Sequence, residues 1–122
     1  SPDIAQTIAL TCLALNVPCH LTGLHTLKIK ETDRLVALKT EIEKFGSQVK
    51  VTNNSLELLP KQNFSQNVSV GTYNDHRMAM AFAPLGLKIP FEIEDAEVVS
   101  KSYPGFWEDF EKLGFKIEKT SI

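Results

Sequence analysis

The chain lacks several features that would assign it to a function class at once. It has two cysteines, no apolar run near the roughly 20 residues that span a bilayer, no secretory signal and no glycine-rich phosphate loop. Thirteen basic and fifteen acidic residues give a net charge of −2, so no overall positive field favours a nucleic acid or membrane partner. Any functional cation must therefore act locally.

The cysteines and histidines also show no metal-ligand pattern. Cys12 and Cys19 form no CxxC pair and lie in segments typical of a helix and a strand. We interpret them as buried free thiols in a reducing cytosol, with a disulfide as the alternative. His20, His25 and His76 have no short ligand spacing with carboxylates or thiols. We therefore expect no metal and no cofactor, a cytoplasmic location, and chemistry performed by side chains alone.

The pattern of hydrophobic residues predicts an α/β protein. At 122 residues, the chain is long enough for one modest core. It opens at Ser1-Pro2-Asp3 without an initiator Met, so we interpret residues 1–122 as a single partial domain of a longer protein. Helices are expected at 3–16, 31–45, 75–87 and 103–113, and strands at 18–29, 47–52, 55–59, 68–70, 90–94 and 115–119.

Local signals support several of these elements. Asn53-Asn54 favours a hairpin turn, because Asn tolerates positive φ. Gly46 is expected to end the second helix, and Pro84 to kink the third. The second helix carries one apolar stripe, formed by Leu35, Leu38, Ile42 and Phe45.

The order of elements repeats along the chain. Asp3 and Asp75 each precede an Ala-rich helix as a possible N-cap, and Lys30 and Lys101 each come just before a later helix. We interpret the repeat as two copies of one α-β-α-β unit, at about 3–60 and 75–119. Coincidence of ordinary α/β patterning is the alternative. True repeats would place equivalent helix starts on one face of the domain.

Two clusters of opposed charge stand at these helix starts. They are Lys30-Glu31-Thr32-Asp33-Arg34 and Asp75-His76-Arg77. A helix start attracts anions through its free N–H groups. With Lys101, the clusters offer four cations for a small multiply charged anion, since Arg binds phosphate and carboxylate bidentately and Lys acts as a movable charge. These cations are Lys30, Arg34, Arg77 and Lys101.

The acids and the histidine next to these cations suggest proton transfer. Glu31 or Asp3 could donate or accept a proton, and His76 could orient a ligand or shuttle one near neutral pH. Each residue also has an ordinary structural explanation, as a first-turn acid, a helix cap, a surface ion pair or a structural histidine. The pair Met78 and Met80 is expected to line the core. Only the joint arrangement favours function.

At these residues the sequence resembles the enolpyruvyl transferase family. The resemblance is carried by KETDR at 30–34, YNDHRMAM at 73–80, KSYPGFW at 101–107 and PDIAQT at 2–7, and it runs nearly end to end. The resemblance is to those family members whose acceptor is shikimate 3-phosphate. The UDP-N-acetylglucosamine enolpyruvyl transferases share the fold but do not carry the first two of these motifs as a pair. The implied fold is an inside-out α/β barrel, with about two of three repeats in this chain, from the C-terminal part of the phosphoenolpyruvate-side domain.

The resemblance implies a reaction in the shikimate pathway of aromatic amino-acid biosynthesis. The enolpyruvyl group of phosphoenolpyruvate would pass to the 5-hydroxyl of shikimate 3-phosphate with release of phosphate, and glyphosate would act at the same site. Glu31 would transfer a proton at the methylene carbon, Asp3 would accept the hydroxyl proton, and Lys30 would bridge both substrates. Phosphoenolpyruvate would be held by Arg34, Arg77 and Lys101, with His76 in support.

The resemblance also implies a second domain, which supplies further ligands to both substrates. We therefore expect the remainder of its own chain to be this segment's partner, the segment to be inactive alone, and the parent to be a monomer. Two alternatives stay open, an enolpyruvyl transferase with another acceptor and a non-catalytic anion-binding module.

Overall fold

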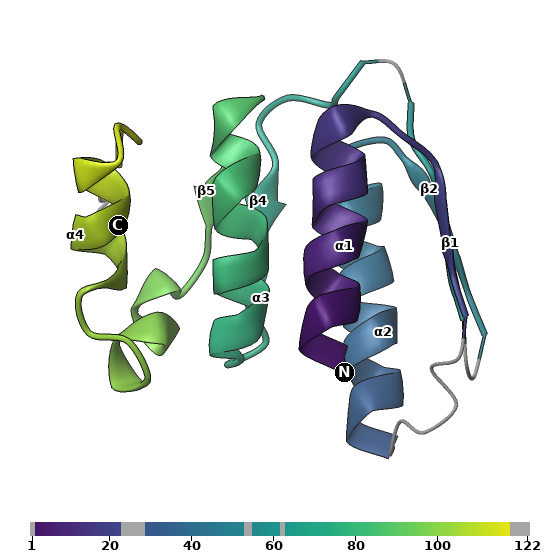
Figure 1. Ribbon diagram of the computed structural model, residues 1–122, viewed down its shortest axis with the longest axis horizontal. Coiled ribbons are helices and arrows are strands. Elements are labelled where there is room, and N and C mark those ends of the chain that lie inside the picture. The colour runs from purple at the N-terminus through teal and green to yellow at the C-terminus, as the bar shows by residue number, and fades with distance from the viewer. Residues whose placement is uncertain (1, 23–28, 53–54, 62, 118–122) are drawn as a thin grey trace.

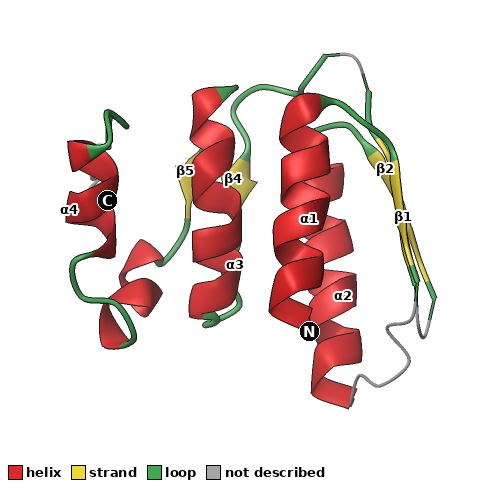
Figure 2. Ribbon diagram, viewed as in Figure 1, coloured by secondary structure: helices red, strands yellow, loops and turns green. Residues whose placement is uncertain are grey.

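The computed structural model describes the backbone of residues 2–22, 29–52, 55–61 and 63–117, and their side chains apart from residues 2–5, 29–34 and 101. Helices and short strands alternate along the chain (Figures 1 and 2). The α-helices and strands are α1 (Pro2–Leu15), β1 (Cys19–Leu21), α2 (Ile29–Glu43), β2 (Gln48–Val51), β3 (Leu56–Leu59), β4 (Ser69–Val70), α3 (His76–Phe82), β5 (Glu92–Ile93) and α4 (Phe106–Lys112). Two 3-10 helices are η2 (Ala83–Leu87) and η3 (Ala96–Lys101).

The first sheet is antiparallel with strand order β1-β3-β2, and α1 and α2 cover one of its faces (Figure 1). In β3, Leu56 and Leu58 are buried and alternate with less buried neighbours, as expected for a strand with one face on the core. The predicted hairpin of β2 and β3 is confirmed, although its turn at 53–54 lies outside the described residues. The strand predicted at 18–29 was too long, because β1 ends at Leu21 and Ile29 already belongs to α2.

The second sheet contains β4 and β5, which pair in parallel with Val70 opposite Ile93. The chain between them forms α3 and η2, so these helices make the crossover that parallel strands require. The strands predicted at 68–70 and 90–94 are thus present in shorter form. The strand predicted at 115–119 was wrong for residues 115–117, which form no strand, and its last two positions lie outside the described residues.

Helix α3 ends where Pro84 was expected to disturb it. The α-helical part stops at Phe82, and the chain continues as η2 with Pro84 in its first turn, because proline has no N–H for the next helical bond. The start of α3 is capped by Asp75, whose Oδ1 accepts a hydrogen bond of 2.9 Å from the Arg77 N–H. This confirms Asp75 as an N-cap.

A main core lies between the first sheet and helices α1, α2 and α3. The predicted apolar stripe is fully part of it, including Phe45, which lies in the turn just after α2 and is 0% exposed. The Phe45 ring packs against the rings of Phe64, Phe82 and Phe91 at centroid distances of 6.5, 6.0 and 5.4 Å. Long-range aromatic contacts of this kind bring β4, α3 and β5 onto the first half of the chain.

A smaller cluster lies on the other side of α3. Its buried members are Ala79, Ala83, Val99 and Phe106, with half-buried Met80, Trp107 and Phe110 around them. Helix α3 therefore faces two cores, with Met78 and Phe82 in the main one. Among the described helices, none is long and apolar enough to cross a membrane. The division into two repeat copies stays a prediction.

Candidate functional site

The candidate site lies at the end of the molecule where α1, α2 and α3 begin (Figure 1). Asp3 lies in the first turn of α1, and Lys30 and Glu31 lie in the first turn of α2. Arg34 follows on the next turn of α2. The structure describes only the backbone at these positions, so the directions of their side chains stay a prediction.

Two of the expected helix positions need correction. Asp3 was expected to cap its helix, but α1 already begins at Pro2, a residue favoured at the first helical position because its missing N–H is no loss there. Lys101 was expected just before α4, but it is the last residue of η3, and residues 102–105 separate it from α4. Its side chain is not described. Helix η3 packs against α3, so the Lys101 backbone stays near the same end.

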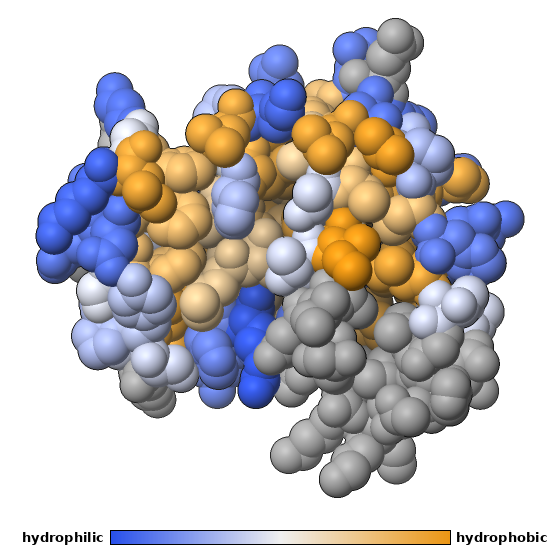
Figure 3. All heavy atoms as spheres, in the orientation of Figure 1, coloured by the Kyte–Doolittle hydropathy of each residue, from blue (hydrophilic) through white to orange (hydrophobic). Residues whose placement is uncertain are grey.

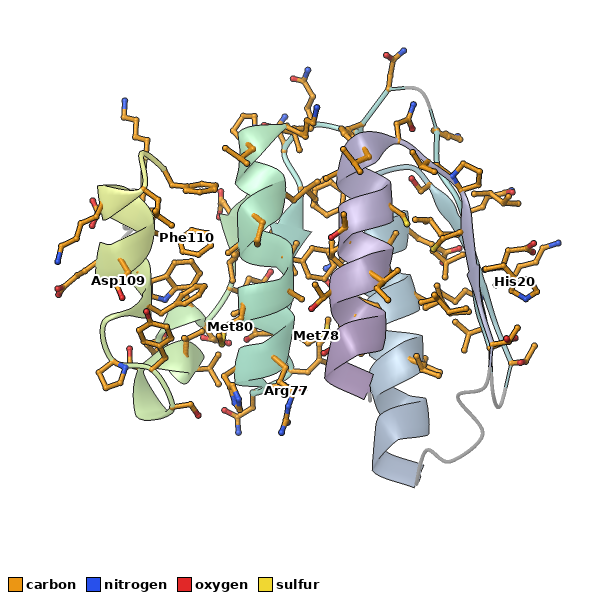
Figure 4. All side chains as sticks on the ribbon, in the orientation of Figure 1. His20, Arg77, Met78, Met80, Asp109 and Phe110 are labelled. Carbon is orange, nitrogen blue, oxygen red and sulfur yellow. The ribbon has the colours of Figure 1, made fainter. Side chains whose placement is uncertain are left out.

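Arg77 is the member of the cation set whose side chain is described. It projects from the start of α3 at the end where α1 begins (Figure 4). Its side chain is 39% exposed, and one guanidinium nitrogen lies 3.9 Å from Asp75 Oδ1. His76 is half-buried beside it. Because α3 has seven residues, its dipole is small, and the guanidinium is the stronger positive group at this helix start.

The opposite end of the molecule has a different character. Hydrophobic residues gather along the upper part of the face formed by α1, α3 and α4 (Figure 3). Large exposed apolar side chains there include Leu15, Leu87 and Leu113, at the ends of α1, η2 and α4. The described charged candidates therefore stand at the end of the helices away from this apolar region.

Buried residues join the start of α3 to α1. Met78 is fully buried, and its sulfur accepts a hydrogen bond of 3.4 Å from the side-chain amide of Gln6, itself buried in α1. Met80 packs on the smaller cluster on the opposite side of α3 (Figure 4). The prediction that both methionines line the core is confirmed. Gln6 fixes α3 against α1 and was not foreseen as a contact.

The sequence reasoning missed Glu41, a buried carboxylate on α2. Its side chain forms an ion pair of 2.6 Å with the Lys44 ammonium, and accepts hydrogen bonds of 2.8 Å from the Gly71 N–H and 2.5 Å from the Tyr73 hydroxyl. A signal was present, because Glu41 stands within the apolar stripe, three residues after Leu38. A charged residue at such a position needs buried partners.

These partners shift the ionisation of the pair. Burial alone would raise the pKa of Glu41, but hydrogen bonds from Lys44, Tyr73 and the Gly71 N–H, with the Lys44 charge, outweigh it and lower the pKa. Partial burial of the Tyr73 ring and its bond to the Glu41 carboxylate raise the pKa of Tyr73 to about 12. Glu41 is therefore ionised and Tyr73 is a hydrogen-bond donor at neutral pH.

The cysteines take no part in the candidate site. Cys12 and Cys19 are free thiols, as predicted, but they are half-buried where fully buried thiols were expected. Burial, followed by the neighbouring Cys12 thiol, raises the pKa of Cys19 to about 11. Across the part of the chain that the structure describes, no group of three or more His, Cys, Asp or Glu residues is placed to hold a metal ion.

Comparison with known proteins identifies one family. A family model described as EPSP synthase (3-phosphoshikimate 1-carboxyvinyltransferase) matches residues 1–110. A 3-phosphoshikimate 1-carboxyvinyltransferase from Bacteroides fragilis is 50% identical over 120 residues, which cover 96% of this chain and 29% of the relative. One from Clostridium kluyveri is 39% identical over 123 residues, covering 99% of this chain and 29% of the relative.

Solved structures agree on the fold. A structure of EPSP synthase from Acinetobacter baumannii superimposes with a TM-score of 0.83 at 24% identity, over 98% of this chain and 29% of that protein. The expected α/β fold is thereby confirmed. The chain spans about 29% of the length of these two curated relatives.

Proposed function

Because this chain belongs to the EPSP synthase family, we propose that it forms part of the active site of a 3-phosphoshikimate 1-carboxyvinyltransferase. The reaction moves the enolpyruvyl group of phosphoenolpyruvate onto the 5-hydroxyl of shikimate 3-phosphate and releases phosphate. The observation that supports this most is the common position of the charged motif residues, at the end where α1, α2 and α3 begin.

The proposed chemistry follows from the charge types at this end. Glu31 protonates the methylene carbon of phosphoenolpyruvate, while Asp3 accepts the proton of the attacking hydroxyl. The hydroxyl oxygen bonds to the central carbon and forms a tetrahedral intermediate. Loss of a methyl proton to Glu31 then restores the double bond as the carbon–oxygen bond to phosphate breaks. The released phosphate takes up the proton that Asp3 accepted, so atoms and protons balance without an external oxidant or reductant.

The cations stabilise the charge of the substrates and of the intermediate. Arg34, Arg77 and Lys101 bind the carboxylate and phosphate of phosphoenolpyruvate, and Lys30 lies between the two substrates. Fixed positive groups favour the intermediate without reorganising during the reaction. His76 supports them as a polar neighbour of Arg77. Of this set, the described guanidinium of Arg77 already points out from the candidate site end (Figure 4).

The enzyme also needs residues that this chain does not provide. In the proposal, the remainder of its own chain completes both substrate sites, so the 122 residues alone show no turnover. We further propose that the enzyme works in the cytoplasm as a monomer and binds glyphosate at its phosphoenolpyruvate site. Turnover by the purified segment would contradict the proposal that the 122 residues alone are inactive. Gel filtration of the full enzyme tests whether it is a monomer.

A chimera tests the function directly. Residues 1–122 replace the matching segment of the Bacteroides fragilis relative, and phosphate release from phosphoenolpyruvate is measured with and without shikimate 3-phosphate. We expect release only with both substrates, a loss of at least about a hundredfold in Lys101→Ala, and no loss in the exposed control Lys88→Ala. Release that does not depend on shikimate 3-phosphate would contradict the acceptor.

A second variant separates an enzyme from an anion-binding module. Glu31→Gln removes the proposed proton donor without removing a cation. We expect turnover to fall by about a hundredfold or more, while phosphoenolpyruvate binding, followed by calorimetry, is kept or strengthened. Unchanged turnover in a folded Glu31→Gln chimera would remove Glu31 from the mechanism.

A further inference from the structure

Glu41 stands out among the buried groups that the proposed reaction does not use. Glu41 is 1% exposed. Burying a carboxylate costs free energy unless hydrogen-bond donors or positive charges contact its oxygens. Both oxygens are occupied: Oε1 by the Gly71 N–H and the Lys44 ammonium, Oε2 by the Tyr73 hydroxyl. Lys44 in turn donates to the Ser69 carbonyl at 3.0 Å. Glu41 therefore ties α2 to the segment that leads into α3.

That segment has an unusual backbone. Tyr73 and Asn74 both have φ of 56°, the left-handed region that residues with a Cβ enter at a cost. Asn tolerates this conformation, whereas for Tyr the surroundings must hold it. The bonds from Gly71 and Tyr73 to Glu41 lie on either side of Thr72, whose own hydroxyl donates to the Glu94 carbonyl at 3.0 Å. Glu41 thus supplies two of the anchors of this turn.

The turn sets the start of α3. The Asp75 N–H donates to the Thr72 carbonyl at 2.8 Å, which closes the turn. Asp75 then returns to an extended backbone with φ of −124°, and its side chain accepts the Arg77 N–H. The position of the Arg77 backbone, and hence the origin of its guanidinium, depends on this sequence of bonds. These bonds give Glu41 an indirect path to Arg77, through the turn.

We propose that Glu41 is a positioning residue for the anion site, which holds the Gly71–Asp75 turn so that Arg77 meets the carboxylate or phosphate of phosphoenolpyruvate. Glu41 also lies on the helix that begins with Lys30 and Glu31. It therefore joins, through one helix and one turn, the two charged motifs that the reaction requires together. The inference rests on the proposed function, since it assumes that Arg77 binds phosphoenolpyruvate.

The test uses the chimera and compares the KM values of the two substrates. Glu41→Gln keeps the size of the side chain but loses its charge and its ability to accept all three bonds. We expect the KM for phosphoenolpyruvate to rise about tenfold, whereas that for shikimate 3-phosphate stays within about twofold. Tyr73→Phe removes one bond and is expected to raise the phosphoenolpyruvate KM by about threefold. The matched control is Glu43→Gln, an exposed acid on the same helix, which leaves both KM values unchanged.

The double variant identifies the route of the effect. Tyr73→Phe should add little once Glu41→Gln is present, because both act on the same turn. A merely structural role would lower the unfolding temperature without separating the two KM values. Equal rises in both, or no change in a folded Glu41→Gln chimera, would overturn the proposal. If Glu41→Gln does not fold, Tyr73→Phe decides, because Tyr73 is 55% exposed and the substitution removes only a hydroxyl.

Arg77→Lys distinguishes this inference from the proposed function. If Arg77→Lys raises the phosphoenolpyruvate KM and Glu41→Gln does not, Glu41 has no positioning role and the function stands. If neither variant changes it, Arg77 is not a ligand of phosphoenolpyruvate, and the role of Glu41 fails with it. The Bacteroides fragilis parent is measured in parallel. If the parent is active and the folded chimera is not, the proposed function itself is overturned.

Discussion

The two hydrophobic clusters on either side of α3 are built in different ways. The main core joins two long helices, α1 and α2, to a three-stranded sheet and is centred on the fully buried Phe45. The smaller cluster joins α3, η3 and α4, and most of its aromatic rings are only half-buried. Long elements thus enclose their apolar residues, whereas short elements leave theirs partly open to solvent.

The two sides of the molecule should therefore differ in their resistance to unfolding. Buried apolar area is the main source of stability, so the half that contains α1, α2 and the first sheet should resist unfolding more strongly. The Glu41 network joins this half to the turn before α3. The turn before α3 is therefore bonded to the half of the molecule that should be more stable.

The largest effect is expected from Phe45→Ala. Removing this ring leaves a cavity at the contacts with Phe64, Phe82 and Phe91, and we expect a loss of about 3–5 kcal/mol in the free energy of unfolding. Urea unfolding followed by circular dichroism measures it, with Phe45→Leu as the milder control. A loss below about 1 kcal/mol would contradict the central place of Phe45.

Phe106→Ala tests the smaller cluster. Phe106 is 6% exposed, but its partners Tyr103, Trp107 and Phe110 are less buried, so we expect a smaller loss, of about 2 kcal/mol. Trp107 is the only tryptophan of the chain and its ring centre lies 4.8 Å from that of Phe106. Its fluorescence should therefore change as well. A loss equal to that of Phe45→Ala would remove the contrast between the clusters.

Acid should weaken the junction between the two sides. The pKa of Glu41 is lower in the folded chain than its ordinary value of 4.5, so the unfolded chain binds the proton more readily. The stabilisation is complete above about pH 4.5 and is lost as the pH falls through the lower folded pKa. Glu41→Gln should cost about 1–2 kcal/mol at neutral pH, and less in acid.

The measurement is urea unfolding across a range of acid pH, with Glu43→Gln as the control. The difference between the native chain and Glu41→Gln should narrow as the pH falls. A difference that stays constant through this range would show that the charge of Glu41 does not stabilise the fold.

The smallest effect concerns Cys19, on the first sheet. Because the pKa of Cys19 is raised to about 11, its thiolate is scarce at neutral pH, and alkylation by iodoacetamide should be slow. Mass spectrometry of the modified peptide gives the rate, and the urea-unfolded chain is the control. Equal rates in the folded and unfolded chains would contradict the protection of Cys19 by the fold.

Much of the main core could be predicted from the sequence, because its signals are local and repeated. The stripe from Leu35 to Phe45 has the helical period, although α2 ends at Glu43 and a turn continues to Gly46, whose φ is 101°. Short elements were harder to predict. The apolar run before α2 was interpreted as strand to Ile29, where the structure has helix, since short apolar runs fit either period.

The candidate site divides in the same way. The motifs at 30–34 and 73–80 identified the charged residues and the family. Glu41 was missed, because its role comes from partners about 30 positions away, Gly71 and Tyr73. The end of η3 at Lys101 was also missed, because 3-10 helices have few bonds and a weak sequence pattern.

By itself, the sequence determined the chemical types of the candidate site, the apolar stripe of α2 and the family, since these depend on residue identity and local spacing. Only the tertiary structure decided that α1, α2 and α3 begin at one end and that Glu41 holds the turn before Arg77. Such contacts join residues far apart in the chain. Their geometry is fixed when the core packs, because packing sets which distant groups come within bonding distance.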